Sequence, residues 1–221
     1  MIKKGYTLAE TLITLAIIGV IAAILTPAVI NAQPNREMVA FKKAYKQASR
    51  VLHELANDED FYDRNKGFTD DTQVSYNGVS YGGVGNTPAA KHAIKLCGLL
   101  KSRFVITSEG DCTNEKGRWF ETSDGALWRL RFFDTNSSSI NFNRNYILID
   151  VNGSSRGNNC MESAPPTTWQ DDVSKCEQND IPDTFRINFS KFGAVQLPEN
   201  GIEQKYIDET SNTKKYKDLK D

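Results

Sequence analysis

The hydrophobic positions of this chain follow two different patterns, one continuous and one periodic. Residues 6–30 are almost wholly apolar, whereas the rest of the sequence is rich in Asn, Ser, Thr, Asp and Lys. A helix of about 25 residues is about 37 Å long, which is enough to cross a hydrocarbon core of about 30 Å. The continuous pattern therefore predicts one membrane-spanning helix ahead of a polar chain.

The periodic pattern begins just beyond this apolar run. Its hydrophobic residues, three or four positions apart, are Met38, Phe41, Tyr45, Ala48, Leu52 and Leu55. This spacing traces one face of an amphipathic helix. Pro34 suits the first turn of that helix, and the acidic run 58–60 at its negative end favours termination near Asn57. We predict a long spine helix, with a transmembrane half at 6–30 and a half-buried half at 31–57.

The rest of the chain alternates between strand-like and loop-like segments. Apolar and polar residues alternate with the period of two that is typical of half-buried strands. The predicted strands are a hairpin near 74–84 and segments at 128–132, 146–151, 185–189 and 194–197, with a further helix at 89–101. We therefore expect an α+β fold, with the spine helix packed on an antiparallel sheet domain at 58–200. Residues 201–221 are polar and charged, and are expected to form a flexible tail.

The length of the chain predicts a single domain, and its charge argues against nucleic acid binding. The 221 residues suffice for one domain plus a membrane segment. Lys and Arg number 27 against 28 Asp and Glu, a formal net charge of −1. Without a broad cationic field to attract phosphates, dedicated nucleic acid binding is not expected.

Neither a secretory signal peptide nor a plain membrane anchor explains the apolar segment fully. The length of the segment argues against the first, and Glu10 argues against the second. A secretory signal peptide has an apolar core of only about 7–15 residues. A plain membrane anchor explains the length but not Glu10, a carboxylate one turn inside the run. Such a charge costs about 2.5–3.5 kcal/mol on insertion scales, so something must compensate for it.

The residues around Glu10 resemble a known processing signal. The sequence Gly5-Tyr6-Thr-Leu-Ala-Glu10, with Lys3 and Lys4 before it and an apolar helix after it, is similar to the cleavage and methylation motif of type IV prepilins and pseudopilins. The resemblance implies that a membrane-embedded prepilin peptidase removes the leader 1–5 by cutting between Gly5 and Tyr6, and then methylates the Tyr6 amino terminus. Family members most often begin with Phe, so Tyr6 departs from the pattern but keeps an aromatic ring.

The resemblance also implies a function and a set of partners. It implies a pilin-like structural subunit, major or minor, of a type IV pilus, a type II secretion pseudopilus or a competence-type filament. Expected partners are other pilin-like subunits, the prepilin peptidase, the inner-membrane platform of the assembly machinery and membrane lipid. The expected location is a single pass through the inner (cytoplasmic) membrane with an extracytoplasmic C-terminal domain, followed by a periplasmic or cell-surface filament.

Glu10 has a specific role in this hypothesis. In a bundle of packed helices, it can neutralise the amino terminus of a neighbouring subunit within a core of low dielectric constant. The alternative is that Glu10 faces the bundle of an unrelated membrane complex. The alternative function is a membrane-tethered extracytoplasmic binding module that does not polymerise.

The four cysteines are best explained as disulfides. Cys97, Cys112, Cys160 and Cys176 lack the C-x-x-C spacing of zinc or thioredoxin-like sites. Four cysteines allow three pairings, and short loop closure favours Cys97 with Cys112 and Cys160 with Cys176. Four free buried thiols are the alternative, which the oxidising compartment indicated by the membrane segment disfavours.

One cluster of side chains with oxygen atoms can be interpreted in two ways. The sequence contains no recognisable catalytic site. Asp150, Asn152 and Asp183 could converge on a structural calcium, or Asp150-Val-Asn152-Gly153 could be a plain turn with solvated acids. A complete calcium loop motif is absent, so no cofactor is required. His53 and His92 are distant in sequence and no Gly-rich phosphate loop is present, so we expect that the protein is not an enzyme.

Overall fold

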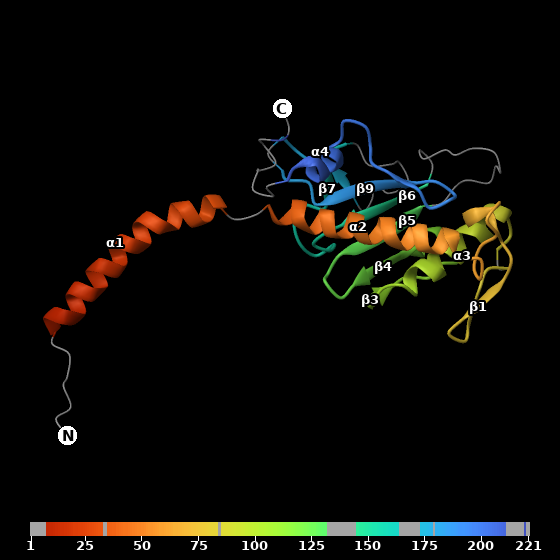
Figure 1. The fold of residues 1–221 in the computed structure, drawn as a ribbon, viewed down its shortest axis with the longest axis horizontal. Helices are drawn as coiled ribbons and strands as arrows, with labels where there is room; N and C mark the ends of the chain where they lie inside the picture. The colour runs from red at the N-terminus through yellow and green to blue at the C-terminus, as the bar shows by residue number, and fades with distance from the viewer. Residues whose placement is uncertain are drawn as a thin grey trace, which may run out of the picture.

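The computed structural model describes residues 8–32, 35–83, 85–131, 145–163, 173–178, 180–210 and 219. In these residues the helices are α1 (Leu8–Ala32), α2 (Arg36–Asn57), α3 (Pro88–Lys101) and α4 (Ile202–Asp208), with 3-10 turns at Gly67–Thr69 and Glu115–Gly117. Figure 1 shows α1 standing away from a domain in which α2 lies along a sheet. The fold is α+β, as the sequence predicts.

The main sheet is antiparallel and has six strands in the order β10-β9-β6-β5-β4-β3. They are β3 (Ile106–Glu109), β4 (Trp119–Thr122), β5 (Leu127–Arg131), β6 (Tyr146–Asp150), β9 (Thr184–Phe189) and β10 (Val195–Gln196). Two small pairs flank it, an antiparallel hairpin of β1 (Val74–Tyr76) with β2 (Val79–Tyr81), and a parallel pair of β7 (Cys160–Met161) with β8 (Ser174–Lys175).

The predicted spine is divided into two helices at Asn35. This residue is the N-cap of α2, and its side-chain oxygen accepts a hydrogen bond from the backbone N–H of Met38 at 3.0 Å. The sequence predicts Pro34 in the first turn of this helix, and that prediction is wrong because α2 begins at Arg36, after the N-cap Asn35. The other end agrees with the prediction, since α2 ends at Asn57 with Asp58 as its C-cap.

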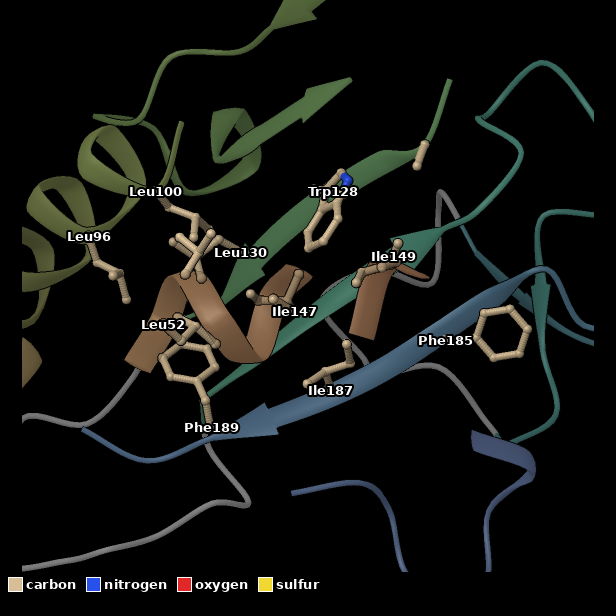
Figure 2. Close-up of a cluster of buried hydrophobic side chains, with 14 of the residues drawn as sticks. Leu52, Leu96, Leu100, Trp128, Leu130, Ile147, Ile149, Phe185, Ile187 and Phe189 are labelled. Atoms are coloured by element: carbon tan, nitrogen blue, oxygen red, sulfur yellow. The ribbon is translucent and has the colours of Figure 1, made fainter. Parts of the chain in front are cut away.

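The apolar stripe of α2 forms one side of the hydrophobic core. Five of its six predicted positions are buried, and Tyr45 is partly buried against the same cluster. Phe41 of α2 contacts Phe185 of β9 with ring centroids 4.6 Å apart. Figure 2 shows Leu52 of α2 facing side chains of the central strands, among them Ile147 and Phe189. Since each fully buried large apolar side chain contributes about 1.5–3 kcal/mol, this stripe holds α2 on the sheet.

The opposite face of the sheet is also buried, which differs from the prediction of half-buried strands. Every residue of β5 and β6 is buried, and Arg129 and Arg131 of β5 are only 8% and 3% exposed. A second apolar cluster lies on this face, where Met161 and Val173 pack with Tyr146 and Leu148 of β6. The alternation of Trp, Leu and Arg identified the strand correctly, but it could not show that residues from the segment between β6 and β9 would fold over the polar side.

The predicted flexible tail is wrong for its first part. Residues 202–208 form α4, in which Ile202 and Tyr206 are buried at 1% and 0% exposure. The Tyr206 ring lies 5.5 Å from that of Phe185 and 6.5 Å from that of Phe41. Leu219 is also buried, at 9% exposure. A few apolar residues within a polar segment are sufficient to dock it, because they join the main hydrophobic cluster of the domain.

Docking α4 buries a carboxylate. Glu203 is 5% exposed, and its Oε1 accepts a hydrogen bond from the backbone N–H of Arg186 at 3.1 Å. Burial raises the pKa of the Glu203 carboxyl above its usual value, and the nearby Glu162 raises it further, whereas the hydrogen bond opposes both. Folding therefore favours the protonated form of this side chain.

We predict that Glu203→Gln stabilises the domain at pH 8. For a carboxyl whose folded pKa is raised, the stability contribution is full below the unfolded value near 4.3 and is lost as pH rises through the folded pKa. The amide keeps the acceptor for Arg186 and removes the charge. Thermal unfolding should show a Tm above that of the parent at pH 8, by about 2–4 °C for each kcal/mol, and little difference at pH 4. A lower Tm for the variant at both pH values would mean that the carboxylate is net stabilising.

Candidate functional site

Helix α1 is exposed along its apolar stretch from Leu8 to Thr26. Among the described residues it is the one helix long and apolar enough to cross a membrane, over Leu8–Thr26, and no part of that span is buried in the domain. Leu8 is 80% exposed and Ile24 is 69% exposed. A continuous apolar surface of this size requires lipid or other apolar helices around it.

The threonine hydroxyl groups of α1 donate hydrogen bonds to backbone carbonyls of the same helix. Thr11 donates to the carbonyl of Leu8 at 2.8 Å, and Thr14 donates to that of Thr11 at 2.9 Å. Thr26 donates to the carbonyl of Ala22 at 2.6 Å. Since an unpaired polar group in hydrocarbon costs several kcal/mol, about 4–8 for a hydroxyl in cyclohexane, these internal bonds make the helix compatible with a bilayer.

Glu10 remains as the one ionisable side chain within Leu8–Ala32. It lies exposed in the first turn of α1, where the positive end of the helix dipole favours a carboxylate. That effect is about 0.3–1 kcal/mol, less than the insertion cost, so it offsets only part of it. The predicted cleavage residues Gly5 and Tyr6 lie outside the described residues, and the pairing of Glu10 with a neighbouring amino terminus stays a prediction.

The four cysteines form the two disulfides that loop length favours. Cys97 of α3 bonds to Cys112 with Cα atoms 5.8 Å apart, and Cys160 of β7 bonds to Cys176 with Cα atoms 4.9 Å apart. The first ties α3 to the loop between β3 and β4. The second closes the segment that covers the far face of the main sheet. Both are structural, and no cysteine is left free.

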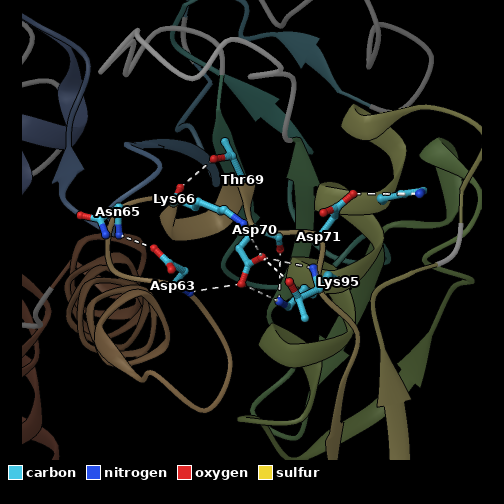
Figure 3. A network of polar contacts seen from close by, with 9 residues as sticks. Asp63, Asn65, Lys66, Thr69, Asp70, Asp71 and Lys95 are labelled. Atoms are coloured by element: carbon cyan, nitrogen blue, oxygen red, sulfur yellow. Dashed lines mark hydrogen bonds and ion pairs between the residues drawn. The ribbon is translucent and has the colours of Figure 1, made fainter.

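Sequence reasoning missed a buried charged cluster, which Figure 3 shows beside α3. Lys95 is fully buried, and its Nζ lies 3.7 Å from Asp70 Oδ2, 3.1 Å from the Asp70 carbonyl and 4.3 Å from the Tyr62 ring centroid. Asp70 also accepts hydrogen bonds from the backbone N–H groups of Asp63 and Thr72 and from the Thr72 hydroxyl. The available signal was a lysine on the apolar face of a predicted helix.

The electrostatics of this cluster indicate a structural role. Burial lowers the pKa of Lys95, although Asp70 opposes the shift, and burial followed by the charge of Asp70 raises the pKa of Tyr62. Burial also acts to raise the pKa of Asp70, but the bonds from Thr72 and Asp63 and the charge of Lys95 outweigh it, so the net shift is downward. A fully buried amine cannot reach a substrate, so the cluster fastens the segment after α2 to α3.

The structure brings together the three residues predicted as a calcium site. Asn152 Nδ2 donates to Asp183 Oδ2 at 3.3 Å, and Asp150 and Asp183 are each 1% exposed. Asp150 Oδ1 accepts from the backbone of Asn152 at 3.3 Å and of Gly153 at 2.9 Å, which describes an Asx turn. Asp183 accepts from the backbone N–H groups of residues 158, 159 and 160 at 2.8, 3.0 and 2.9 Å.

The side chains of these residues carry oxygen atoms, the type of ligand that a hard cation such as Ca²⁺ prefers. Burial and then the charge of Asp183 raise the pKa of Asp150 to about 6, so two carboxylates repel each other in a poorly solvated site. The side-chain oxygens of Asn152 and Asn159 are buried without a hydrogen-bond partner in the part of the chain described. No group of three or more His, Cys, Asp or Glu that could hold a metal occurs there either, so a cation would depend on these amide oxygens.

Comparison with known proteins identifies the N-terminal segment. Residues 1–26 match the family model described as the prokaryotic N-terminal methylation motif, which is the prepilin-type motif. No curated protein and no solved structure matches the chain. The motif implies contact with other pilin subunits and with the processing peptidase, and its family is structural and not enzymatic. With α1 it indicates a membrane-anchored protein that has an extracytoplasmic domain. The motif, the apolar helix and the α+β domain together support a type IV pilin-like family for this chain.

Proposed function

We propose that this protein is a structural subunit of a filament of the type IV pilus class and has no enzymatic activity. The observation that carries the proposal is the prepilin-type motif joined to a helix that buries no part of its apolar span Leu8–Thr26. A surface of this kind is satisfied first by lipid and then, after assembly, by the same helices of other subunits. The filament is a type IV pilus, a type II secretion pseudopilus or a competence-type filament, with the protein as a major or a minor subunit.

Assembly follows from the arrangement of the two helices. Before assembly, α1 holds the subunit in the inner membrane and α2 carries the sheet domain on the extracytoplasmic side. After the leader is removed, Glu10 meets the amino terminus of a neighbour in the helical core, and the two charges compensate each other in a medium of low dielectric constant. The inner-membrane platform, driven by a cytoplasmic ATPase, moves the subunit out of the lipid.

Mass spectrometry of the mature protein tests the processing step. In a host with an active prepilin peptidase, the purified chain should lack residues 1–5 and begin with a methylated Tyr6. The basis is the position of the cleavage motif, in which Gly5 has no side chain to obstruct a protease. Gly5→Leu serves as the comparison variant and should retain the leader. Recovery of the intact Met1 terminus from the parent in that host contradicts the proposal.

Replacing Glu10 with Ala separates a filament subunit from a tethered binding module. We expect the variant to insert into the membrane and to be processed, but its incorporation into filaments should fall by at least about tenfold. Loss of one charge partner in a low-dielectric core exceeds the 1.4 kcal/mol that corresponds to a factor of ten. Immunoblotting of sheared filaments against membranes gives the ratio.

Glu37→Ala is the matched control, because Glu37 lies in the first turn of α2, beyond the apolar span. It should assemble at the parental level. If Glu10→Ala assembles equally well, the carboxylate has no role in assembly, and the non-polymerising module becomes the better description.

We also propose that Asp150, Asn152 and Asp183 hold a structural calcium ion. The specific observation in favour is the pair of buried, mutually repelling carboxylates beside amide oxygens that lack a partner. A divalent cation supplies positive charge that would neutralise both carboxylates. With or without the ion, Asp183 would hold the loop between β6 and β7 in place. Its carboxylate accepts hydrogen bonds from two backbone N–H groups of that loop and from that of Cys160 at the start of β7.

Calcium should therefore raise the Tm of the EDTA-treated protein. At a concentration about 100-fold above Kd the stabilisation is about 2.7 kcal/mol, or roughly 5–10 °C for a chain of this size. Asp150→Asn should abolish the rise, whereas Asp60→Asn, a change at an exposed carboxylate after α2, should leave it intact. An equal Tm in calcium and in EDTA assigns these residues to the turn alone.

A further inference from the structure

Charge is segregated along the exposed side of α2. Lys43, Lys46 and Arg50 are separated by three and four residues, so they lie on one face, and all three are exposed. We call these residues the basic ridge. Lys43 is bridged to Asp124 at 2.6 Å and Arg50 is 3.9 Å from Glu54, but Lys46 makes no ion pair within the described part of the chain.

A hollow of about 460 Å³ lies beside the basic ridge, between α2 and the residues that lead into β10. On its helical side the charged residues are Lys46, Arg50 and Glu54, and Gly193, Ala194 and Val195 line the other side. β10 is the edge strand of the main sheet. Since Arg50 already lies near Glu54, Lys46 is the cation of this hollow that is available to a negatively charged partner, within the described part of the chain.

The chain itself carries such a charge at the far end of the same helix. Asp58, Glu59 and Asp60 follow α2 directly, and we call these residues the acidic turn. Carboxylates are unfavourable at the negative end of a helix dipole, so the acidic turn does not stabilise its own helix. Asp58 accepts from the backbone N–H of Asp60 and Glu59 pairs with Arg64 at 2.7 Å, but the Asp60 carboxylate makes no hydrogen bond or ion pair to any described residue.

We propose that the basic ridge of one subunit binds the acidic turn of a second copy of this chain. The two features are centred about 13 residues apart on one axis, which corresponds to a displacement of about 20 Å between parallel copies. The proposal rests on the filament function proposed above and assigns the charged surface that sets the offset between two subunits.

The geometry of this contact makes it open-ended. The two partners use different surfaces, so each added copy leaves one basic ridge and one acidic turn unoccupied. A contact of this kind propagates as a filament and does not close into a dimer. Since exposed ion pairs give orientation and register more than affinity, the apolar α1 helices supply the attraction and this contact selects the axial position.

Charge reversal in the full-length chain tests the proposal, in a host with the peptidase and the assembly platform. Lys46→Glu and Asp60→Lys should each reduce filament yield by about fivefold, the scale of losing and reversing one exposed ion pair. The double variant K46E/D60K should restore it, because each copy again presents opposite charges at the two positions. The yield of the parent should also fall in added salt, as screening shortens the range of the attraction to about 3 Å at 1 M.

Matched controls separate folding, processing and assembly. Lys175→Glu and Glu177→Lys reverse exposed charges elsewhere and should assemble like the parent. The Tm and the mature N-terminus of every variant should equal those of the parent. If the parent forms filaments and both single reversals do so at parental yield, or if the double variant is not restored, this inference is wrong while the filament function stands. If the parent is processed yet enters no filament, the proposed function itself fails.

Discussion

The organisation of this protein depends on a change in the distribution of apolar side chains at Asn35. Before it, α1 is apolar on all sides and buries none of its span in the domain. After it, α2 is apolar on one side and buries that side against the main sheet. A helix that is apolar on all sides has no polar face to keep in water, so transfer of its whole surface out of water is favourable. A helix that is apolar on one side buries that side and leaves its polar side exposed. This single difference separates a helix suited to lipid from a helix that packs in the folded domain.

Both faces of the main sheet are covered by other segments, and one disulfide constrains the segment that covers the second face. α2 covers one face, and the segment between β6 and β9 covers the other with Met161 and Val173. In the described residues of that segment, the regular structure consists of β7 and β8, which are two residues each. The Cys160–Cys176 bond and the backbone hydrogen bonds accepted by Asp183 supply the constraint that a longer strand would otherwise give.

Charged groups act in three different ways in this molecule, according to their solvation. Lys95 and Asp70 are buried together, and breaking such a pair leaves an uncompensated charge, so they fix one local arrangement. Glu10 lies on a helix suited to lipid, and the counter-charge that we propose for it is the amino terminus of a neighbouring subunit. Lys46 and Asp60 are exposed to water, where their attraction is weak and specifies position more than affinity.

The sequence by itself determined the elements whose signal is local. An apolar run predicts a membrane helix, a stripe of three and four predicts α2, alternation predicts β5 and β9, and loop length predicts the disulfides, because each depends only on neighbouring residues. Tertiary structure alone decided the rest. The short strands β3 and β4, the burial of Arg129 and Arg131, the docking of α4 through Tyr206 and the pairing of Lys95 with Asp70 all depend on contacts between segments distant in sequence. A residue's exposure is set by what folds over it, and that information is not present in its own neighbourhood of the chain.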